Sequence, residues 1–198
     1  TLKLLDVIRN YSLDTKFIFP SSAAVYGNPM YLPMSESDPT VPISPYGVAK
    51  LSAERYVDVY SKLYGVQACS LRVFSVYGPR QRNLVVYDSI MKLLRDNQEI
   101  HILGNGLQKR DFLYIRDVVD AFLLVAREAE LKGEVYNVAS GISISINDLI
   151  SIIATRLNCS PKFIHEENTT GDPDIWVSSI EKISKLGFIP KFNLENGI

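Results

Sequence analysis

The stretch Ser44-Pro-Tyr-Gly-Val-Ala-Lys50 follows a proline-rich polar loop, and upstream of that loop the apolar run Lys16-Phe-Ile-Phe19 leads into Pro20-Ser21-Ser22. The apolar run is short and bounded by polar residues and proline, which predicts a buried strand. A serine N-cap followed by proline at the first helical position predicts a helix over 45–64, ending at Gly65. The chain is therefore expected to place a strand that ends in two hydroxyl groups before a helix that carries a tyrosine and a lysine.

The remainder of the chain alternates between apolar runs typical of strands and amphipathic stretches typical of helices. Strands are expected at 66–74, 100–103 and 134–138. Helices are expected at 84–95, at 118–128 and from a cap at Asn147 to 157, and the chain is expected to begin with a helix that ends near Asn10. Short elements are expected at 162–165 and 180–186. This alternation predicts an α/β protein with a parallel sheet.

The composition excludes several classes of protein. The 198 residues include 46% hydrophobic ones, which is enough to bury a core, and their net charge is −1. A nearly neutral chain offers no general attraction to nucleic acid or to an anionic membrane, and no apolar run approaches the roughly 18 residues that span a bilayer. Two cysteines without metal-binding spacing predict neither a disulfide scaffold nor a metal site, and the absence of Gly-x-Ser-x-Gly weakens a hydrolase interpretation. We expect a cytoplasmic protein without nucleic-acid or membrane partners.

Tyr46 and Lys50 lie four residues apart, so on a helix they share one face and can project into one pocket. A free tyrosine has a pKa of about 10, and acting as a base at pH 7 requires a decrease of roughly 3 units, or about 4 kcal/mol. An ammonium group at about 4 Å supplies an interaction of that order when the effective dielectric constant is near 20. Ser22 can hydrogen-bond at the oxygen that the tyrosine deprotonates. Such a pair alone is uninformative in a chain with 11 tyrosines, so this interpretation depends on the capped helix, the upstream serines and the later segment Phe74-Ser-Val-Tyr-Gly-Pro79.

Four segments carry motifs in an informative order: Phe17-Ile-Phe-Pro-Ser-Ser-Ala-Ala-Val-Tyr-Gly27, Ser44-Pro-Tyr-Gly-Val-Ala-Lys50, Leu71-Arg-Val-Phe-Ser-Val-Tyr-Gly-Pro-Arg-Gln81 and Leu103-Gly-Asn-Gly-Leu-Gln-Lys-Arg-Asp-Phe-Leu-Tyr-Ile-Arg-Asp117. Together they resemble the extended short-chain dehydrogenase/reductase family, specifically its nucleotide-sugar epimerases and dehydratases. The resemblance implies an α/β fold in which residues 1–82 form the C-terminal part of a doubly wound, Rossmann-type parallel sheet. Residues 83–198 are expected to form mainly a smaller mixed α/β domain that binds the nucleotide sugar, with some segments returning to the sheet.

Enzymes of this family begin with a strand, a glycine-rich turn and a helix that hold the dinucleotide pyrophosphate. No Gly-x-Gly-x-x-Gly pattern occurs in this chain, which has no initial methionine and opens on what reads as the back half of a helix. At about 30 residues per β-α-β unit, roughly 100 residues of the cofactor domain are expected to be missing. We therefore interpret the chain as a fragment that is inactive alone and binds NAD poorly.

By the same resemblance, the full enzyme is expected to bind NAD and a nucleotide-diphosphate sugar and to form a homodimer. The residues expected to be catalytic are Ser22, Tyr46 and Lys50, which together with Phe74 also contact the cofactor. The tyrosinate takes the proton from a sugar hydroxyl while hydride leaves the same carbon for the nicotinamide. The substrate-binding residues are expected to be Ser75, Asn83, Leu84, His101, Leu103, Arg110 and Asp172. The dimer is expected to use the first helix and an outward row of Leu51, Tyr56, Val59 and Leu63.

Some positions depart from the family pattern. Ala23 and Ala24 stand where 4,6-dehydratases carry an extra acid/base pair, which favours epimerisation at C4 of the sugar. A dehydratase, a reductase or an epimerase acting at another carbon, and a non-catalytic dinucleotide-binding sensor, remain alternative interpretations. Ser75 replaces a common asparagine, and Asn168-Thr169 stand where many relatives have an arginine that binds the diphosphate.

Each expected site residue also has a purely structural interpretation. Arg110 and Asp111 can form a surface ion pair, His101 can fill a strand face, and Phe74 can be a core residue. Trp176 and His165 are interpreted as packing or surface residues.

Overall fold

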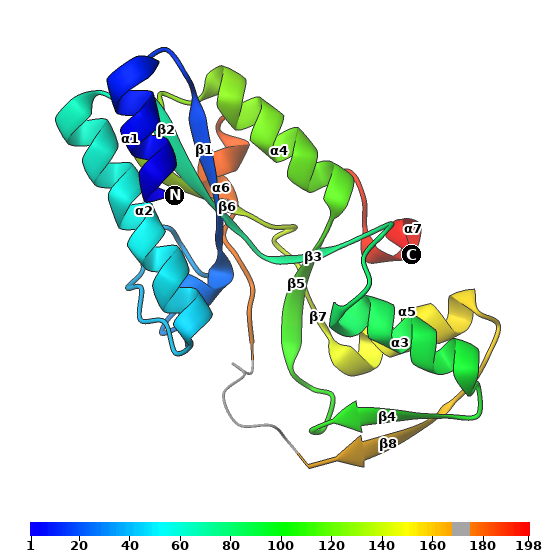
Figure 1. The fold of residues 1–198 in the computed structure, drawn as a ribbon. Helices are drawn as coiled ribbons and strands as arrows, with labels where there is room; N and C mark the ends of the chain where they lie inside the picture. The colour runs from blue at the N-terminus through cyan, green and yellow to red at the C-terminus, as the bar shows by residue number, and fades with distance from the viewer. Residues whose placement is uncertain (168–174) are drawn as a thin grey trace.

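The computed structural model describes residues 1–167 and 175–198, and Figure 1 shows their arrangement. The helices are α1 (Leu2–Tyr11), α2 (Pro45–Tyr64), α3 (Leu84–Arg95), α4 (Ile115–Glu128), α5 (Ile146–Arg156), α6 (Glu181–Ser184) and α7 (Leu194–Gly197), with a short 3-10 turn, η1, at Ala23–Val25. The strands are β1 (Phe17–Ser22), β2 (Ala68–Val73), β3 (Ser75–Tyr77), β4 (Glu99–Leu103), β5 (Lys109–Tyr114), β6 (Lys132–Val138), β7 (Ser143–Ser145) and β8 (Lys162–Glu166).

The main sheet is parallel and has the strand order β1-β2-β6. Ser22 lies opposite Val73, and Val73 lies opposite Val138, so the carboxyl ends of all three strands meet at one edge. Helices α1 and α2 cover one face of this sheet, and α4 and α6 cover the other (Figure 1). Strand β6 comes from the second half of the sequence, so the two halves share this sheet.

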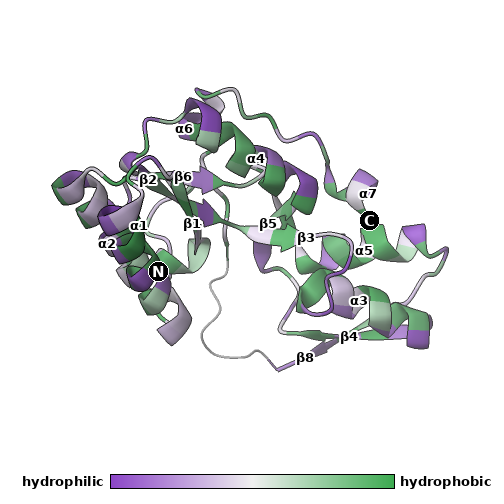
Figure 2. Cartoon of the chain, turned by 45° about the horizontal axis from the view of Figure 1, so that its top comes forward, coloured by the Kyte–Doolittle hydropathy of each residue, from purple (hydrophilic) through white to green (hydrophobic). Residues whose placement is uncertain are grey.

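The central strand β2 is buried on both faces, and its side chains alternate between them. Ala68 packs with α1 and α2, whereas Cys69 and Leu71 pack with α4 and α6. Arg72, on the same face as Ala68, reaches α2. Burial on both faces is typical of strands in parallel sheets covered by helices. Helix α4 alternates hydrophobic and hydrophilic residues along its length (Figure 2), as expected of a helix with one side against a sheet.

Two smaller sheets continue the structure beside the main one. One has the order β3-β5-β7, and the other pairs β4 with β8 in parallel. Helices α3 and α5 pack on them through a core that includes Leu93, Ile100, Ile102, Leu149 and Ile153. None of the helices in the two described ranges is both long enough and apolar enough to cross a bilayer.

The structure confirms several predicted elements and corrects others. Helices 45–64 and 84–95 have the predicted bounds, whereas α4 begins at Ile115, three residues before the predicted start at 118. Asn147 does not cap α5, because the N-cap is Ser145, whose side chain accepts a hydrogen bond from the backbone N–H of Asp148 at 3.0 Å. The amide of Asn147 instead donates to the carbonyl of Asn105. Strands β5 and β7 were not predicted. The first half of β5 and most of the short β7 are polar, and the pairing of β5 with both β3 and β7 makes the segments extended.

Candidate active site

A cleft of about 690 Å³ lies where the carboxyl ends of β1 and β2 face α3, β4 and β5. It collects residues that are far apart in the sequence. The predicted site residues in its lining are Ser22, Tyr46, Phe74, Ser75, Leu84, His101, Leu103 and Arg110. Lys50 lies one turn from Tyr46, and Asn83 precedes Leu84 as the N-cap residue of α3. Asp172 lies outside the described residues.

The tyrosine and lysine are placed by the start of α2. The backbone N–H of Gly47 donates to the Ser44 hydroxyl at 3.1 Å, which caps the helix. The ammonium of Lys50 lies 5.5 Å from the centroid of the Tyr46 ring and donates to the carbonyl of Pro20 at 2.7 Å. Tyr46 itself is 56% exposed. The phenol is therefore open to the cleft, with a cation held beside it at the end of β1.

Gly47 allows α2 to approach the end of β1. A Cβ atom at this position would lie 2.5 Å from the carbonyl oxygen of Ala24 and 2.9 Å from Cβ of Pro42. Because a backbone atom cannot give way as a flexible side-chain end can, only glycine permits this contact. The close approach brings Tyr46, the residue before Gly47, next to the turn that follows Ser22.

The two serines at the end of β1 point to opposite faces of the sheet, as neighbouring residues in a strand do. Ser22 lines the cleft, and its hydroxyl accepts a hydrogen bond from the backbone N–H of Ala24 at 3.2 Å. Ser21 is buried under α2, where its hydroxyl donates to Glu54 at 2.5 Å. Ser22, the serine that the family resemblance indicates as catalytic, is therefore the one that lines the cleft.

The middle of the cleft is lined by the start of α3 and by β5. Leu84, the first residue of α3, has φ +71°, a left-handed conformation that is rare for a branched side chain and that concentrates at functional sites. The guanidinium carbon of Arg110 lies 5.5 Å from the centroid of the Trp176 ring. The indole N–H of Trp176 donates to the carbonyl of Gly27 at 3.3 Å, and Trp176 also lines the cleft. A single tryptophan carries no spacing signal, so only the tertiary structure identifies it as part of the site.

The far end of the cleft is lined by β4. The ring of His101 lies on the β8 side, with Nδ1 2.8 Å from a carboxylate oxygen of Glu166. Just before and just after β4, the backbone bonds to β8 through even-numbered residues: Lys162 N–H donates to the Gln98 carbonyl, and Gly104 N–H donates to the Glu166 carbonyl. With the parallel register of β4 and β8, the even-numbered residues within β4 face β8 in the same way. The N–H and C=O groups of His101 and Leu103 therefore point toward the other edge of β4. Their carbonyls accept hydrogen bonds there, from the side chains of Lys92 and Gln108 respectively, each at 2.9 Å.

Asp111 joins the segment that carries Arg110 to two neighbouring loops. It is fully buried, and its carboxylate accepts hydrogen bonds from the backbone N–H groups of Ser140, Gly141 and Ser178 and from the Ser140 hydroxyl. Burial raises the pKa of Asp111, and these hydrogen bonds oppose the rise. A carboxylate so placed is a structural anchor, which argues against a solvent-exposed ion pair with its neighbour.

A sequence model of the NAD dependent epimerase/dehydratase family matches residues 1–139. A putative UDP-glucose 4-epimerase of Methanocaldococcus jannaschii is 37% identical over 203 residues, covering 100% of this chain and 65% of that protein. The dTDP-D-glucose 4,6-dehydratase of Mus musculus is 34% identical, covering 92% of this chain and 53% of that protein. The crystal structure of UDP-glucuronic acid 4-epimerase from Bacillus cereus with UDP-glucuronic acid and NAD is 34% identical with a TM-score of 0.90, covering 99% of this chain and 62% of that one.

The chain therefore belongs to the NAD dependent epimerase/dehydratase family. The α/β fold with part of a Rossmann-type parallel sheet is confirmed. The chain spans 65% of the length of the archaeal relative and 53% of the mouse enzyme. Within the described ranges, no group of three or more His, Cys, Asp or Glu side chains is arranged to hold a metal ion.

The burial of Asp111 predicts a characteristic pH dependence of stability. Its raised pKa in the folded chain lies above the ordinary aspartate value of about 3.9, so its contribution to stability is fullest below that value and is lost as the pH rises through the folded-state pKa. Asparagine does not titrate, and it would point amide hydrogens at backbone donors, at a cost of about 1–3 kcal/mol. The difference in free energy of unfolding between wild type and Asp111→Asn is expected to be largest near pH 4 and to shrink toward pH 8. Urea unfolding at several pH values measures it, and a difference that grows with pH contradicts the assignment.

Proposed function

We propose that this chain supplies the catalytic and substrate-binding part of an enzyme that epimerises a nucleotide-diphosphate sugar at C4 through a transient keto intermediate. The observation that carries the proposal is one cleft with Ser22 and Tyr46 at one end and Arg110 with the start of α3 further along. A solved relative binds UDP-glucuronic acid and NAD, which fits a cleft with these two kinds of lining.

The residues at the Tyr46 end fit a proton transfer from a sugar hydroxyl. Tyr46 is open to the cleft and acts as the base, while the Lys50 ammonium beside its ring stabilises the phenolate. The hydroxyl of Ser22 hydrogen-bonds to the sugar oxygen that loses the proton. Phe74 borders the same part of the cleft, and we propose that it contacts the NAD nicotinamide together with the three catalytic residues. NAD, when bound, supplies the hydride acceptor for the sugar carbon.

The middle and far parts of the cleft fit a nucleoside diphosphate. The first N–H groups of α3, beginning at Leu84, form a site that favours an anion. Arg110, whose Nη1 donates to the carbonyl of Lys109 at 2.9 Å, brings a cationic guanidinium to the same cleft for phosphate oxygens. We propose that Ser75 and Asn83 also face the diphosphate and sugar, and that Asp172 belongs to the same site. The nucleoside then lies at the β4 end, against the backbone of His101 and Leu103.

The reaction is assigned as epimerisation from the residues that follow Ser22. Ala23 is buried and Ala24 lines the cleft. Because alanine has no titratable group, neither residue supplies the acid or base that would remove water from the sugar. With proton transfer at a single hydroxyl, the keto intermediate is reduced again on its other face instead of losing its 6-hydroxyl. A 4,6-dehydratase remains the second candidate because the mouse relative carries that name.

The exposed side of α1 and α2 supports a homodimer. Apolar residues exposed on α1 are Leu2, Leu4, Val7 and Tyr11, and those on α2 include Tyr56, Val59 and Leu63. The two helices lie side by side and contact each other (Figure 1). Leu51 is an exception to the predicted outward row, because it is half-buried and packs toward the core around Phe74. We propose that two copies pair these helices as a four-helix interface.

The role of Tyr46 is tested in a chimera that joins the glycine-rich cofactor segment of a family member to residues 1–198. Tyr46→Phe is expected to lower kcat by roughly 10²–10⁴-fold, the usual contribution of a general base, with KM little changed. Tyr31→Phe, at an exposed position outside the cleft lining, is the matched control and should leave kcat unchanged. NMR of the product identifies the reaction: a retained 6-hydroxyl indicates epimerisation, and a 6-deoxy-4-keto sugar would show a dehydratase. Equal rates for Tyr46→Phe and wild type would refute the catalytic assignment.

Residues 1–198 alone are expected to bind UDP but not NAD with micromolar affinity, because the substrate cleft is present and the glycine-rich turn is not. Loss of the Arg110 guanidinium in Arg110→Met should weaken UDP binding about 10–100-fold, the value of a charge-assisted hydrogen bond. Arg116→Met removes the same charge from an exposed position on α4 and should have little effect. Isothermal titration calorimetry measures the three UDP affinities and the NAD affinity of the wild-type chain. Micromolar NAD affinity for the wild-type chain would contradict the expected division of the site.

The dimer is tested by placing a charge in the proposed interface. Leu63→Asp introduces a carboxylate at a position that is 68% exposed on one copy, and it should convert the dimer to a monomer because an unpaired charge is costly to bury. Leu123→Asp, at an exposed position on α4, serves as the control. Light scattering gives the mass in solution. A wild-type monomer, or a dimer that survives Leu63→Asp, counts against this interface.

A further inference from the structure

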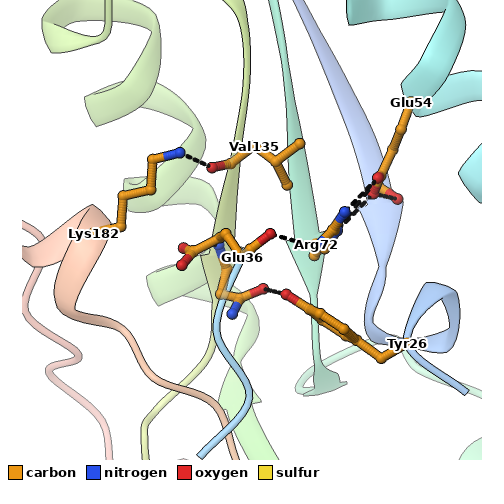
Figure 3. Close-up of polar contacts among 8 residues, drawn as sticks. Tyr26, Glu36, Glu54, Arg72, Val135 and Lys182 are labelled. Carbon is orange, nitrogen blue, oxygen red and sulfur yellow. Dashed lines mark hydrogen bonds and ion pairs between the residues drawn. The ribbon is translucent and has the colours of Figure 1, made fainter. Parts of the chain in front are cut away.

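A buried carboxylate connects the helix that carries Tyr46 to the strand that carries Ser22. Glu54 lies on α2 two turns after Tyr46, and its side chain is 3% exposed. It accepts hydrogen bonds from the Ser21 hydroxyl at 2.5 Å and from Nε and Nη2 of Arg72 at 3.0 and 2.9 Å. Figure 3 shows Glu54 reaching down from its helix to the Arg72 side chain, which rises from β2. Ser21 and Arg72 lie opposite each other on adjacent strands, so the carboxylate is held by both strands at the same level.

Arg72 is itself held in place from the other side. Its guanidinium carbon lies 4.7 Å from the centroid of the Tyr26 ring, and Nη1 donates to the carbonyl of Glu36 at 3.4 Å. The Tyr26 hydroxyl in turn donates to the side chain of Asn137 on β6 at 2.7 Å. Burial alone would lower the pKa of Arg72, but the hydrogen bonds and charges of Glu54 and Tyr26 outweigh it, so its pKa is raised and the guanidinium stays charged. The carboxylate of Glu54 is thus bound to a fixed partner (Figure 3).

Stability by itself does not explain this arrangement. Removing two charges from water is costly, and an apolar pair of the same volume often stabilises a fold as well or better. The Lys50 ammonium and the Ser61 hydroxyl also donate hydrogen bonds to strand carbonyls, those of Pro20 and Ala68, but each bond ties α2 to one strand only. Further contacts of α2 with the sheet, such as Val57 and Tyr60 against Phe19 and Ala68, are apolar and non-directional. Such contacts permit small sliding and rotation of a helix on a sheet. Hydrogen bonds from two strands to one carboxylate are directional, so they resist such sliding and rotation.

We propose that Glu54 is a positioning residue that, through Ser21, sets the place of Tyr46 relative to Ser22. The inference rests on the proposed function of the cleft. Ser21 is the direct neighbour of Ser22, and eight residues of helix, about 12 Å, separate Glu54 from Tyr46. Fixing the helix at Glu54 therefore fixes the phenol at the cleft end, where a displacement of about 1 Å can cost on the order of 100-fold in rate.

The chain offers a matched pair of serines for the test. Ser21→Ala removes the hydroxyl that binds Glu54. Ser70→Ala removes an equally buried hydroxyl on the neighbouring strand β2, on the same face of the sheet. The Ser70 hydroxyl has no hydrogen-bond partner among the described residues. In the chimera, at a temperature where both variants are folded, Ser21→Ala is expected to lower kcat about tenfold with KM unchanged. Ser70→Ala should match wild type. Equal kcat values for the two variants overturn the positioning role.

A second measurement does not depend on activity. In residues 1–198 with labelled tyrosine, the NMR ring resonances of Tyr46 are expected to shift in Ser21→Ala and to stay in place in Ser70→Ala. Tyr46 resonances that are unchanged in Ser21→Ala overturn the inference, even if that variant is less stable. A chimera without epimerase activity overturns the proposed function of the cleft, and the resonances still decide whether Ser21 and Glu54 position the tyrosine.

Discussion

The burial of β2 between two layers of helices is the constraint on which the rest of the structure depends. A strand covered on both faces needs side chains on each face that are either apolar or fully paired. Strand β2 has side chains of both kinds. Cys69 and Leu71 pack against α4 and α6, whereas Arg72 points toward α2 and forms an ion pair with Glu54. Because β1 and β6 run parallel on either side, three strands end at one edge, and the polar residues that follow them meet there. This is the usual place for a binding site in an open α/β sheet.

The cleft then joins two chemically different regions. The Tyr46 end belongs to the main sheet and to the start of α2, and it presents hydroxyl groups with one cation held on the carbonyl of Pro20. The other end belongs to α3, β4 and β5, and it presents backbone donors and Arg110. Asp111 connects the two regions, since its carboxylate binds the loop that leaves β6 and the segment before α6. The nucleotide-diphosphate sugar that we propose as substrate needs such a link, because its sugar and its diphosphate are placed in different regions of the cleft.

Membership of the family narrows the chemistry but not the substrate. Relatives with similar identity to this chain include one named as a 4-epimerase and one named as a 4,6-dehydratase, so overall likeness does not separate the two reactions. We propose that single positions in the cleft separate them. Ala24 lines it and carries no titratable group, which is a local chemical fact that identity over the whole chain does not capture.

Short-range patterns were sufficient for some elements and insufficient for others. The bounds of α2 were predicted because Ser44, Pro45 and Gly65 act within one turn of the helix ends. Ser145 and Asn147 are both favourable caps, and the start of α5 was decided by β7, which pairs with β5 and ends at Ser145. Strands β5 and β7 were not predicted because the first half of β5 and most of β7 are polar, and their extended form depends on pairing with β3 and with each other. The contact of Trp176 with Arg110 joins segments 66 residues apart, a distance over which no local pattern operates.

The sequence by itself determined that Tyr46 and Lys50 share a helix face and that Ser21 and Ser22 point in opposite directions, because both follow from the repeat of a single element. The family resemblance singled out Ser22, but the sequence did not show that Leu51 turns inward or that Glu54 binds both strands. Those outcomes depend on which face of β1 receives α2. Only the tertiary structure decides which face of β1 receives α2. Burial of apolar surface on both faces of the sheet favours the arrangement in which Ser21 and Arg72 both contact Glu54.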